Sequence, residues 1–390
     1  AWQGRLAFAL SLCSLITGLP QPLEIQERLS AWRDCGADCF NGFVQNDLER
    51  VVGKSGSFTK SAFDHAINTS SSVRYQIKSG ILYRDQSTRC AFPQRCNGVE
   101  HLISRALRAH GVPDMEFLVN VFDHPKALGG NQQAPILSFS RATHSFDLMY
   151  PSWAFWKGGP CIASEPGCIG RWDRKRQVIA DNAQQHSWDK KESVLFFRGS
   201  RTNRERDSVV KLGLKDPKRV DAKYTKNQSW RSVADSLGQE PVPEVRLEDH
   251  CSFKYLFNSR GVAASFRHRH LFMCGSLVFD LESDWAEFYY AAMKPWVHYV
   301  PVAQGATDEE TMTNIESLLT FFQEHDNLAR QIAHNGQQFI AQHLRMNDVT
   351  SYWSELLREL YLRQPWKWEL APTAVKVHDA TVDALPHDEL

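Results

Sequence analysis

Short apolar runs alternate with amphipathic stretches along most of the chain. Runs rich in β-branched and aromatic residues predict buried strands at 116–122, 136–139, 193–197 and 276–279. Apolar residues three or four positions apart predict helices at 98–109, 263–273, 310–324 and 327–343. This alternation is typical of an α/β fold built on parallel sheets.

The length and apolar content favour two medium-sized domains. The chain has 390 residues, of which 42% are hydrophobic. The stretch 153–173 is rich in Gly, Pro and Trp and has no clear period, so we interpret it as an irregular connection between domains. We therefore expect one domain at 24–175, a second at 176–362, and a mobile polar tail at 363–390.

Both ends of the chain resemble targeting signals. After Arg5, the apolar run from Leu6 to Ile16 has the length of a signal-peptide core, and we expect the signal peptide to occupy 1–23. The chain ends in His387-Asp388-Glu389-Leu390, which matches the retrieval signal of the endoplasmic reticulum (ER). We expect a protein of the ER lumen that binds a retrieval receptor. No other stretch approaches the length of a membrane span.

The cysteine count fits an oxidising compartment. Of nine cysteines, Cys13 lies in the predicted signal peptide. The short spacings of the others favour the local pairs Cys35 with Cys39, Cys90 with Cys96, Cys161 with Cys168, and Cys251 with Cys274, although spacing alone leaves the connectivity open. The lack of a C-x-x-C motif weakens a metal-binding or thioredoxin-like interpretation.

Two further features concern the surface of the protein. Sequons at Asn68 and Asn227 are candidate glycosylation sites, although such triplets also arise by chance. Lys plus Arg and Asp plus Glu number 45 each, without a long basic block. Nucleic acid is therefore not expected as a partner.

The first candidate for chemistry is Asp123. It directly follows the apolar run 116–122, which would place its carboxylate at the carboxyl end of a buried strand, where open α/β sheets bind ligands. The simpler alternative is that Asp123-His124-Pro125 is only a turn, since Asp before Pro commonly ends a strand. The pattern alone favours the turn.

The second candidate is the segment from Phe197 to Thr202, together with Arg206. A predicted strand here enters a Gly turn, a hydroxyl and several guanidiniums before a helix, which predicts an anion site suited to a diphosphate. The alternative is a surface helix start with solvated arginines.

The third candidate is the segment 260–267, where small residues open a predicted helix and would let a ligand approach the backbone. Helix packing by Ala263 and Ala264 explains the same pattern equally well. His268 and His270 would point to different faces of that helix, so we do not expect a metal pair. The chain also lacks a D-x-D motif, a P-loop and a G-x-S-x-G elbow, and we expect neither a metal nor a cofactor.

Ordered motifs between about residues 35 and 362 closely resemble the Rumi-type protein O-glucosyltransferases. They are Tyr75-Gln76-Ile77, Phe92-Pro93 with Arg95-Cys96, Gly98-Val99-Glu100-His101, Val121-Phe122-Asp123, Tyr150-Pro151-Ser152-Trp153, Gly170-Arg171-Trp172-Asp173, Phe197-Arg198-Gly199-Ser200-Arg201-Thr202, Asp221-Ala222, Tyr224-Thr225-Lys226-Asn227-Gln228, Gly261-Val262-Ala263-Ala264-Ser265-Phe266-Arg267 and Lys294-Pro295-Trp296-Val297-His298-Tyr299.

The resemblance implies a fold, a reaction and a set of site residues. The fold is two Rossmann-like domains facing a cleft, the GT-B type. The reaction transfers glucose from UDP-glucose, with inversion, to serine in C-x-S-x-P/A-C of EGF-like repeats such as those of Notch. The resemblance implies that Asp123 is the general base, that UDP-sugar is bound by Ser200, Arg206, Val262, Ala263, Ala264, Ser265, Phe266 and Arg267, and that the acceptor is bound by Ala91, Phe92, Pro93, Gln94 and Arg95.

The chain departs from the family pattern at two places. Ser351 stands where a distal cysteine normally pairs with an extra N-terminal one, which indicates the loss of one disulfide. The loop 161–168 also differs from the family's usual loop, which contacts the sugar. Two alternatives therefore stay open: a transferase that prefers UDP-xylose, because an apolar pocket discriminates weakly against one missing hydroxymethyl group, and a non-catalytic lumenal chaperone.

Overall fold

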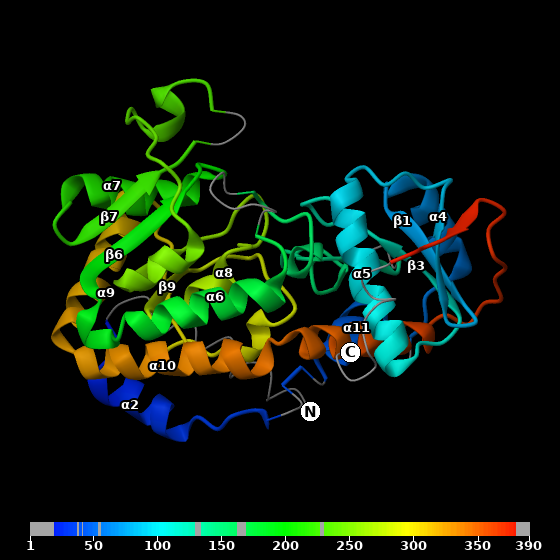
Figure 1. Cartoon of the computed structure of the whole chain (residues 1–390), viewed down its shortest axis with the longest axis horizontal. Coiled ribbons are helices and arrows are strands. Elements are labelled where there is room, and N and C mark those ends of the chain that lie inside the picture. Colours follow the sequence, from blue (N-terminus) through cyan, green and yellow to red (C-terminus); the bar gives the residue numbers. More distant parts are fainter. Residues whose placement is uncertain are drawn as a thin grey trace.

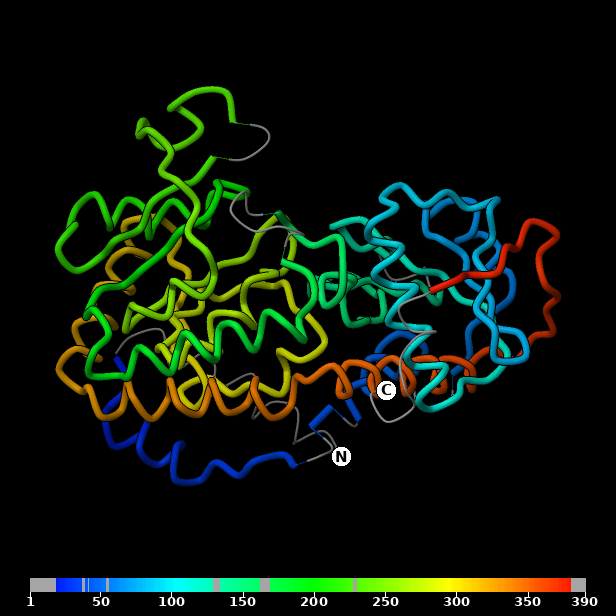
Figure 2. The backbone as a smooth tube through the Cα atoms, viewed as in Figure 1, coloured from blue at the N-terminus to red at the C-terminus, as the bar shows by residue number. Residues whose placement is uncertain are grey.

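The computed structural model describes residues 19–36, 39–40, 42–53, 56–128, 134–161, 169–226 and 230–379. Two α/β bodies lie along the long axis of the molecule (Figure 1), and the chain trace in Figure 2 shows the narrower region that joins them. The two-body α/β architecture predicted from the sequence is confirmed, whereas the details of the sheets and of the chain ends differ.

The first body is built on a six-stranded mixed sheet of order β11-β2-β1-β3-β4-β5. Its strands are β1 (Val73–Lys78), β2 (Ile81–Asp85), β3 (Met115–Val119), β4 (Ile136–Ser138), β5 (Leu148–Met149) and β11 (Ala374–Lys376). The strands β3, β4 and β5 run parallel, but β1 is antiparallel to both β2 and β3. Ser79 and Gly80 have φ values of 52° and 74°, the backbone that a two-residue hairpin turn of right-handed twist requires. Our expectation of purely parallel sheets is therefore wrong for this body.

The second body has a five-stranded, fully parallel sheet of order β10-β9-β8-β6-β7. Its strands are β6 (Glu192–Gly199), β7 (Val220–Tyr224), β8 (Phe253–Asn258), β9 (Leu277–Leu281) and β10 (Val300–Val302). The helices around it are α6 (Trp172–Gln185), α7 (Asp207–Lys215), α8 (His268–Met273), α9 (Asp308–Glu324) and α10 (Asp326–His343). Central strands such as β9 are buried on both faces, which explains their nearly continuous apolar sequence.

The remaining elements cover the first body or connect the sheets. The helices are α2 (Pro22–Ala31), α3 (Phe43–Val52), α4 (Lys60–Thr69), α5 (Pro93–His110) and α11 (Met346–Tyr361). Short helical turns are η2 (Trp153–Phe155), η3 (Trp188–Lys190), η4 (Arg204–Arg206), η5 (Val233–Ser236), η6 (Leu247–Ser252) and η7 (Tyr290–Ala292). None of the described helices is long and apolar enough to cross a membrane.

The two ends of the chain cross between the bodies. The helix α2 packs on α10 of the second body, and its buried Ile25 joins that body's core. Conversely, α11 packs on α5 of the first body, so α10 and α11 together run beneath both bodies in Figure 1. The expected boundaries at 24 and 362 therefore differ from the structure. The reason is that each of these amphipathic helices buries its apolar face on a helix of the body more distant in sequence.

We expected a mobile tail, but the first part of the tail packs on the first body. The strand β11 pairs antiparallel with β2, and Trp366 Nε1 donates to Glu116 Oε1 at 2.9 Å. Gln76 donates to the Glu369 carbonyl and accepts from the Ala371 amide, both at 2.9 Å. These contacts add a strand beside β2 and satisfy buried polar side chains of the interior strands β1 and β3. The retrieval-signal residues 387–390 and the rest of 380–390 lie outside the described residues.

Two elements have other bounds than we expected from the sequence. The strand expected at 116–122 ends at Val119, and the helix expected at 263–273 begins only at His268. The helices expected at 98–109, 310–324 and 327–343 are confirmed within α5, α9 and α10.

Disulfides join Cys35 to Cys39, Cys90 to Cys96 and Cys251 to Cys274, as predicted. Cys161 is disulfide-bonded, while Cys168 lies outside the described residues, so that pairing stays a prediction.

Candidate active site

A cavity of about 560 Å³ lies between the two bodies. The first body contributes Arg95, Asp123, Trp153 and the segment 158–161, and Ile169 of the connection also lines it. The second body contributes the end of β6 with Ser200, Thr202 and Arg206, then Thr225, the segment 244–250 and the loop 261–267. The three candidate segments identified from the sequence therefore meet in one cavity.

Asp123 lies four positions beyond the end of β3 and not at the strand end itself. Asn120, which is fully buried, shapes the intervening loop: its Nδ2 donates to the His124 carbonyl at 2.8 Å, and its Oδ1 accepts from the Phe122 amide at 2.9 Å. The Asp123 side chain is 34% exposed at the cavity wall. Asn120 was not predicted as a functional residue, although an Asn inside the apolar run 116–122 could have indicated a buried polar contact.

Arg95 connects the acceptor segment predicted from the resemblance to the candidate base. From the first turn of α5, its guanidinium donates to the Val121 carbonyl at 2.8 Å and lies 3.2 Å from Asp123 Oδ1. The guanidinium also sits 4.4 Å from the ring centroid of Phe92 and 4.6 Å from that of Trp153. This fixed cation holds the Asp123 carboxylate at the cavity.

The other predicted acceptor residues lie beside this contact. Ala91, Phe92, Pro93 and Gln94 do not line the cavity. Phe92 is 38% exposed and packs edge-on against Phe122, with ring centroids 5.3 Å apart. An exposed aromatic residue next to the cavity mouth suits contact with a protein acceptor, but this role stays a prediction.

On the second body, Arg206, which is buried, and Arg267, which is half-buried, form the positive side of the cavity. The Arg206 guanidinium donates to the carbonyls of Ser200 at 2.7 Å and Arg260 at 2.9 Å, and Arg267 Nη1 donates to the Arg198 carbonyl at 2.6 Å. In the part of the chain that the structure describes, neither forms an ion pair, and Arg267 Nε and Nη2 are buried without a hydrogen-bond partner. Two uncompensated cations beside one cavity favour an anionic ligand.

Burial lowers the pKa of both guanidiniums. It lowers the pKa of Arg206 to about 10, and it lowers the pKa of Arg267, with the nearby Arg206 charge as a further cause. With a pKa of about 10, Arg206 remains charged at neutral pH. Neither guanidinium pairs with a carboxylate of the described residues, so a diphosphate in the cavity would supply that partner.

Gly199 permits this arrangement. A Cβ atom on Gly199 would lie 2.6 Å from Arg267 Nη1 and 3.4 Å from Arg206 Nη1. The glycine at the end of β6 therefore lets both guanidiniums approach the strand. The neighbouring Arg201, expected in the anion site, instead pairs with Asp207 at 2.5 Å and does not line the cavity.

The loop 261–267 closes the cavity and links the bodies. It is not the helix start that we predicted, since α8 begins at His268, so it offers turn backbone and not a helix terminus. Phe266 stacks on Phe139 of the first body with ring centroids 4.9 Å apart. Ala263 and Ala264 are buried, whereas Val262 is exposed. Small side chains here bring the backbone close to the cavity.

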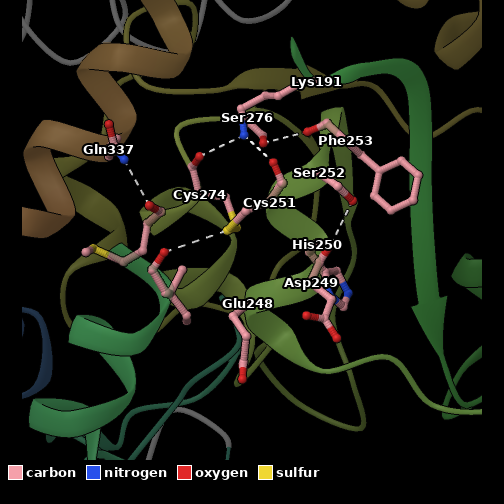
Figure 3. The surroundings of a disulfide bond; sticks show 12 residues. Lys191, Glu248, Asp249, His250, Cys251, Ser252, Phe253, Cys274, Ser276 and Gln337 are labelled. Carbon is pink, nitrogen blue, oxygen red and sulfur yellow. Dashed lines mark hydrogen bonds between the residues drawn. A yellow bond between two sulfur atoms is a disulfide. The ribbon is translucent and has the colours of Figure 1, made fainter. Parts of the chain in front are cut away.

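A buried clamp fixes the wall opposite this loop. Leu247 and His250 of η6 line the cavity, and burial lowers the pKa of His250 to about 4, so its ring is neutral at pH 7. Figure 3 shows how η6 is tied to the end of α8: the Cys251–Cys274 disulfide joins the two, and buried Lys191 donates to the carbonyls of both cysteines. Neither Lys191 nor His250 was predicted from the sequence as part of the site.

A second grouping of potential ligands lies away from the cavity. Within the described residues, the group that could hold a metal ion is Asp34, Cys35, Cys39 and His343, and none of the four lines the cavity. Its two cysteines form a disulfide, and His343 Nε2 lies 2.7 Å from Asp34 Oδ1. The expectation that the reaction needs no metal stays a prediction.

A carboxylate on one α/β body that faces two guanidiniums on the other, across a cleft, is the arrangement of a two-domain glycosyltransferase of the GT-B type. The sequence matches the family "Glycosyl transferase family 90" over residues 33–386, and the chain belongs to this family.

Curated relatives agree with this assignment. The chain is 48% identical over 86% of its length to "O-glucosyltransferase rumi homolog" of Aedes aegypti, covering 81% of that protein. It is 43% identical to "Protein O-glucosyltransferase 1" of Homo sapiens, over 86% of this chain and 84% of the relative. It is 41% identical to "O-glucosyltransferase rumi" of Drosophila melanogaster, over 86% of this chain and 81% of the relative.

Proposed function

We propose that the protein transfers glucose from UDP-glucose to a serine within the C-x-S-x-P/A-C motif of folded EGF-like repeats, including those of Notch-type receptors. The relatives that are named O-glucosyltransferases support the reaction class. The observation that carries the proposal for this chain is the shared cavity, which brings Asp123 of one body together with Arg206 and Arg267 of the other.

The mechanism follows from the positions of these charges. The serine hydroxyl attacks the anomeric carbon from the face opposite UDP, and Asp123 accepts its proton in the transition state. The bond to UDP breaks, and Arg206 and Arg267 stabilise the negative charge that develops on the diphosphate. A single displacement inverts the α-linked donor to a β-glucoside. A second carboxylate is unnecessary because UDP leaves without protonation.

The two bodies have separate tasks in this scheme. Ser200, Arg206 and the loop Val262, Ala263, Ala264, Ser265, Phe266 and Arg267 bind the UDP-sugar. The segment Ala91, Phe92, Pro93, Gln94 and Arg95 binds the protein acceptor, with Arg95 fixing Asp123 between the two. No metal takes part, since guanidiniums replace the cation that many nucleotide-sugar enzymes hold on the diphosphate.

The cellular setting is also a proposal. The protein acts in the ER lumen on secreted and membrane proteins that carry EGF-like repeats, and a retrieval receptor binds its C-terminal His387-Asp388-Glu389-Leu390. Asn68 lies exposed in the last turn of α4 and is accessible to glycosylation; Asn227 lies outside the described residues.

One competition experiment tests the proposal. The protein is incubated in EDTA with a folded EGF repeat that carries C-x-S-x-P-C and with equimolar UDP-glucose and UDP-xylose, and the mass added to the serine peptide is measured. We expect a hexose. A pentose would identify the xylosyltransferase alternative, activity only after a metal is added would contradict the metal-free mechanism, and binding of the repeat without transfer would favour the chaperone.

A further inference from the structure

A hydrogen-bonded relay lies behind the loop that closes the cavity. Asn258 ends β8 and pairs in register with Asp280 on β9. Its Nδ2 donates to Asp280 Oδ1 at 2.6 Å, and its Oδ1 accepts from the Ser265 hydroxyl at 2.8 Å. Asn258 and Ser265 are 3% and 4% exposed, so these bonds are shielded from water.

The order of donors and acceptors in this relay is fixed by Asp280. An ionised carboxylate only accepts hydrogen bonds, so the Asn258 amide must turn its NH₂ group toward Asp280 and its oxygen toward Ser265. The single hydroxyl hydrogen of Ser265 is consequently committed to Asn258. The carboxylate thereby holds the loop from two residues away, through a side chain on the neighbouring strand.

The same carboxylate also faces the other end of the loop. Asp280 Oδ2 lies 3.4 Å from His268 Nε2, and His268 Nδ1 lies 3.0 Å from the Tyr289 hydroxyl. Ser265 and His268 flank Phe266 and Arg267. One half-buried acid therefore lies against both ends of the segment that carries Arg267, whose guanidinium lines the cavity.

Asn258 and Asp280 act from outside the cavity. They line a second hollow of about 710 Å³, which shares Ala264 and Ser265 with the cavity between the bodies. The loop forms the wall between the two hollows, and neither Asn258 nor Asp280 is among the residues that line the first one. Neither residue therefore contacts a ligand in the active-site cavity directly.

We propose that Asn258 and Asp280 are positioning residues, which hold Ser265 and the following Phe266-Arg267 in the geometry that binds the diphosphate of the donor. This inference rests on the proposed use of the cavity by a uridine diphosphate sugar. The relay takes no part in the chemical step. It orders the loop before the ligand binds, and this reduces the entropic cost of binding.

The test measures UDP affinity by calorimetry for the wild type, Ser265→Ala, Asp280→Asn and the double variant. We expect each single change to weaken UDP binding about fivefold to tenfold, the effect of one lost hydrogen bond in a buried site. Because both act through one relay, the double variant should bind no more weakly than the weaker single variant. Ser265→Thr keeps the hydroxyl and should restore most of the affinity.

Asp326→Asn is the matched control. Asp326 accepts hydrogen bonds from Lys254 and Trp188, each at 2.9 Å, in the same body but away from the cavity. It should leave UDP affinity unchanged even where it lowers the melting temperature. Equal losses of UDP affinity in the control and in Asp280→Asn would show that the relay affects only general stability, which would overturn the proposal. Additive losses in the double variant, or unchanged affinity in both single variants, would also overturn it. A wild type that fails to bind UDP would instead refute the proposed function.

Discussion

Arg95 and Asp123 lie 3.2 Å apart, guanidinium to carboxylate, at the wall of the first body. The second body presents Arg206 and Arg267 to the same cavity without any such partner in the described residues. The positive charge on the first body is thus used to place a carboxylate, whereas that on the second body is left for a ligand. This difference separates a position for proton transfer from a position for the leaving group.

Asp123→Asn should slow turnover strongly and leave UDP binding intact. The amide keeps the size of the side chain but cannot take a proton, so kcat should fall about 100- to 10,000-fold. Transfer to an EGF repeat and calorimetric UDP affinity are measured side by side. Asp114→Asn, which changes an exposed acid of the same body that accepts from the Ser79 amide at 2.7 Å, is the control. Full turnover by Asp123→Asn would exclude Asp123 as the base.

Arg206→Ala should weaken UDP binding and slow turnover together, since the charge that stabilises the diphosphate is lost. Removing a charge-assisted contact should reduce affinity about tenfold to 100-fold. Arg206→Lys retains the charge and guards against misfolding of the alanine variant. Arg219→Ala removes a guanidinium that pairs with Asp216 and Glu316 in the same body, and it should leave UDP affinity unchanged. Unchanged affinity in a folded Arg206→Ala protein would contradict the anion site.

Replacing both Cys251 and Cys274 by serine should lower stability and UDP affinity. The bridge closes a segment of 23 residues between η6 and α8, and its removal should cost about 3 kcal/mol in the free energy of unfolding. Leu247 and His250, which line the cavity, would lose their anchor. Calorimetric melting and UDP titration check both effects. The matched change at Cys35 and Cys39, which do not line the cavity, should leave UDP affinity as it is; an equal loss there would contradict the local role of the clamp.

Lys191 should make stability depend on pH in the alkaline range. Burial lowers its pKa from 10.5 to about 8. Between these two values the unfolded chain binds the proton more tightly than the folded protein does, so this group makes the free energy of unfolding rise with pH, by up to about 3 kcal/mol. Denaturant unfolding of the wild type and of Lys191→Met at pH 7.5 to 10 measures the difference. The variant should lack this rise, and identical pH slopes would show that Lys191 titrates normally.

The sequence predicted most of the helices and three of the disulfides correctly. Periodicity identified α5, α9 and α10, and short spacings predicted the disulfides Cys90–Cys96 and Cys251–Cys274. These features depend on residues close together in the chain. Asp123 and Arg206 were candidates from their positions after apolar runs, but the pattern alone favoured a simple turn at Asp123, and the family resemblance supplied its predicted role.

The tertiary structure decided how these pieces combine. Sequence patterns could not place α2 on the second body and α11 on the first. An apolar helix face indicates that the helix is buried, but it does not indicate which element it packs against. Sequence patterns also predicted that a helix begins at 263, whereas the chain forms a loop up to His268 in which Ser265 is held by Asn258, a tertiary contact that overrides local propensity. The sequence by itself determined the elements and the candidate residues. Packing alone determined that Asp123, Arg206 and Arg267 meet in one cavity, because that meeting depends on contacts between side chains far apart in the chain.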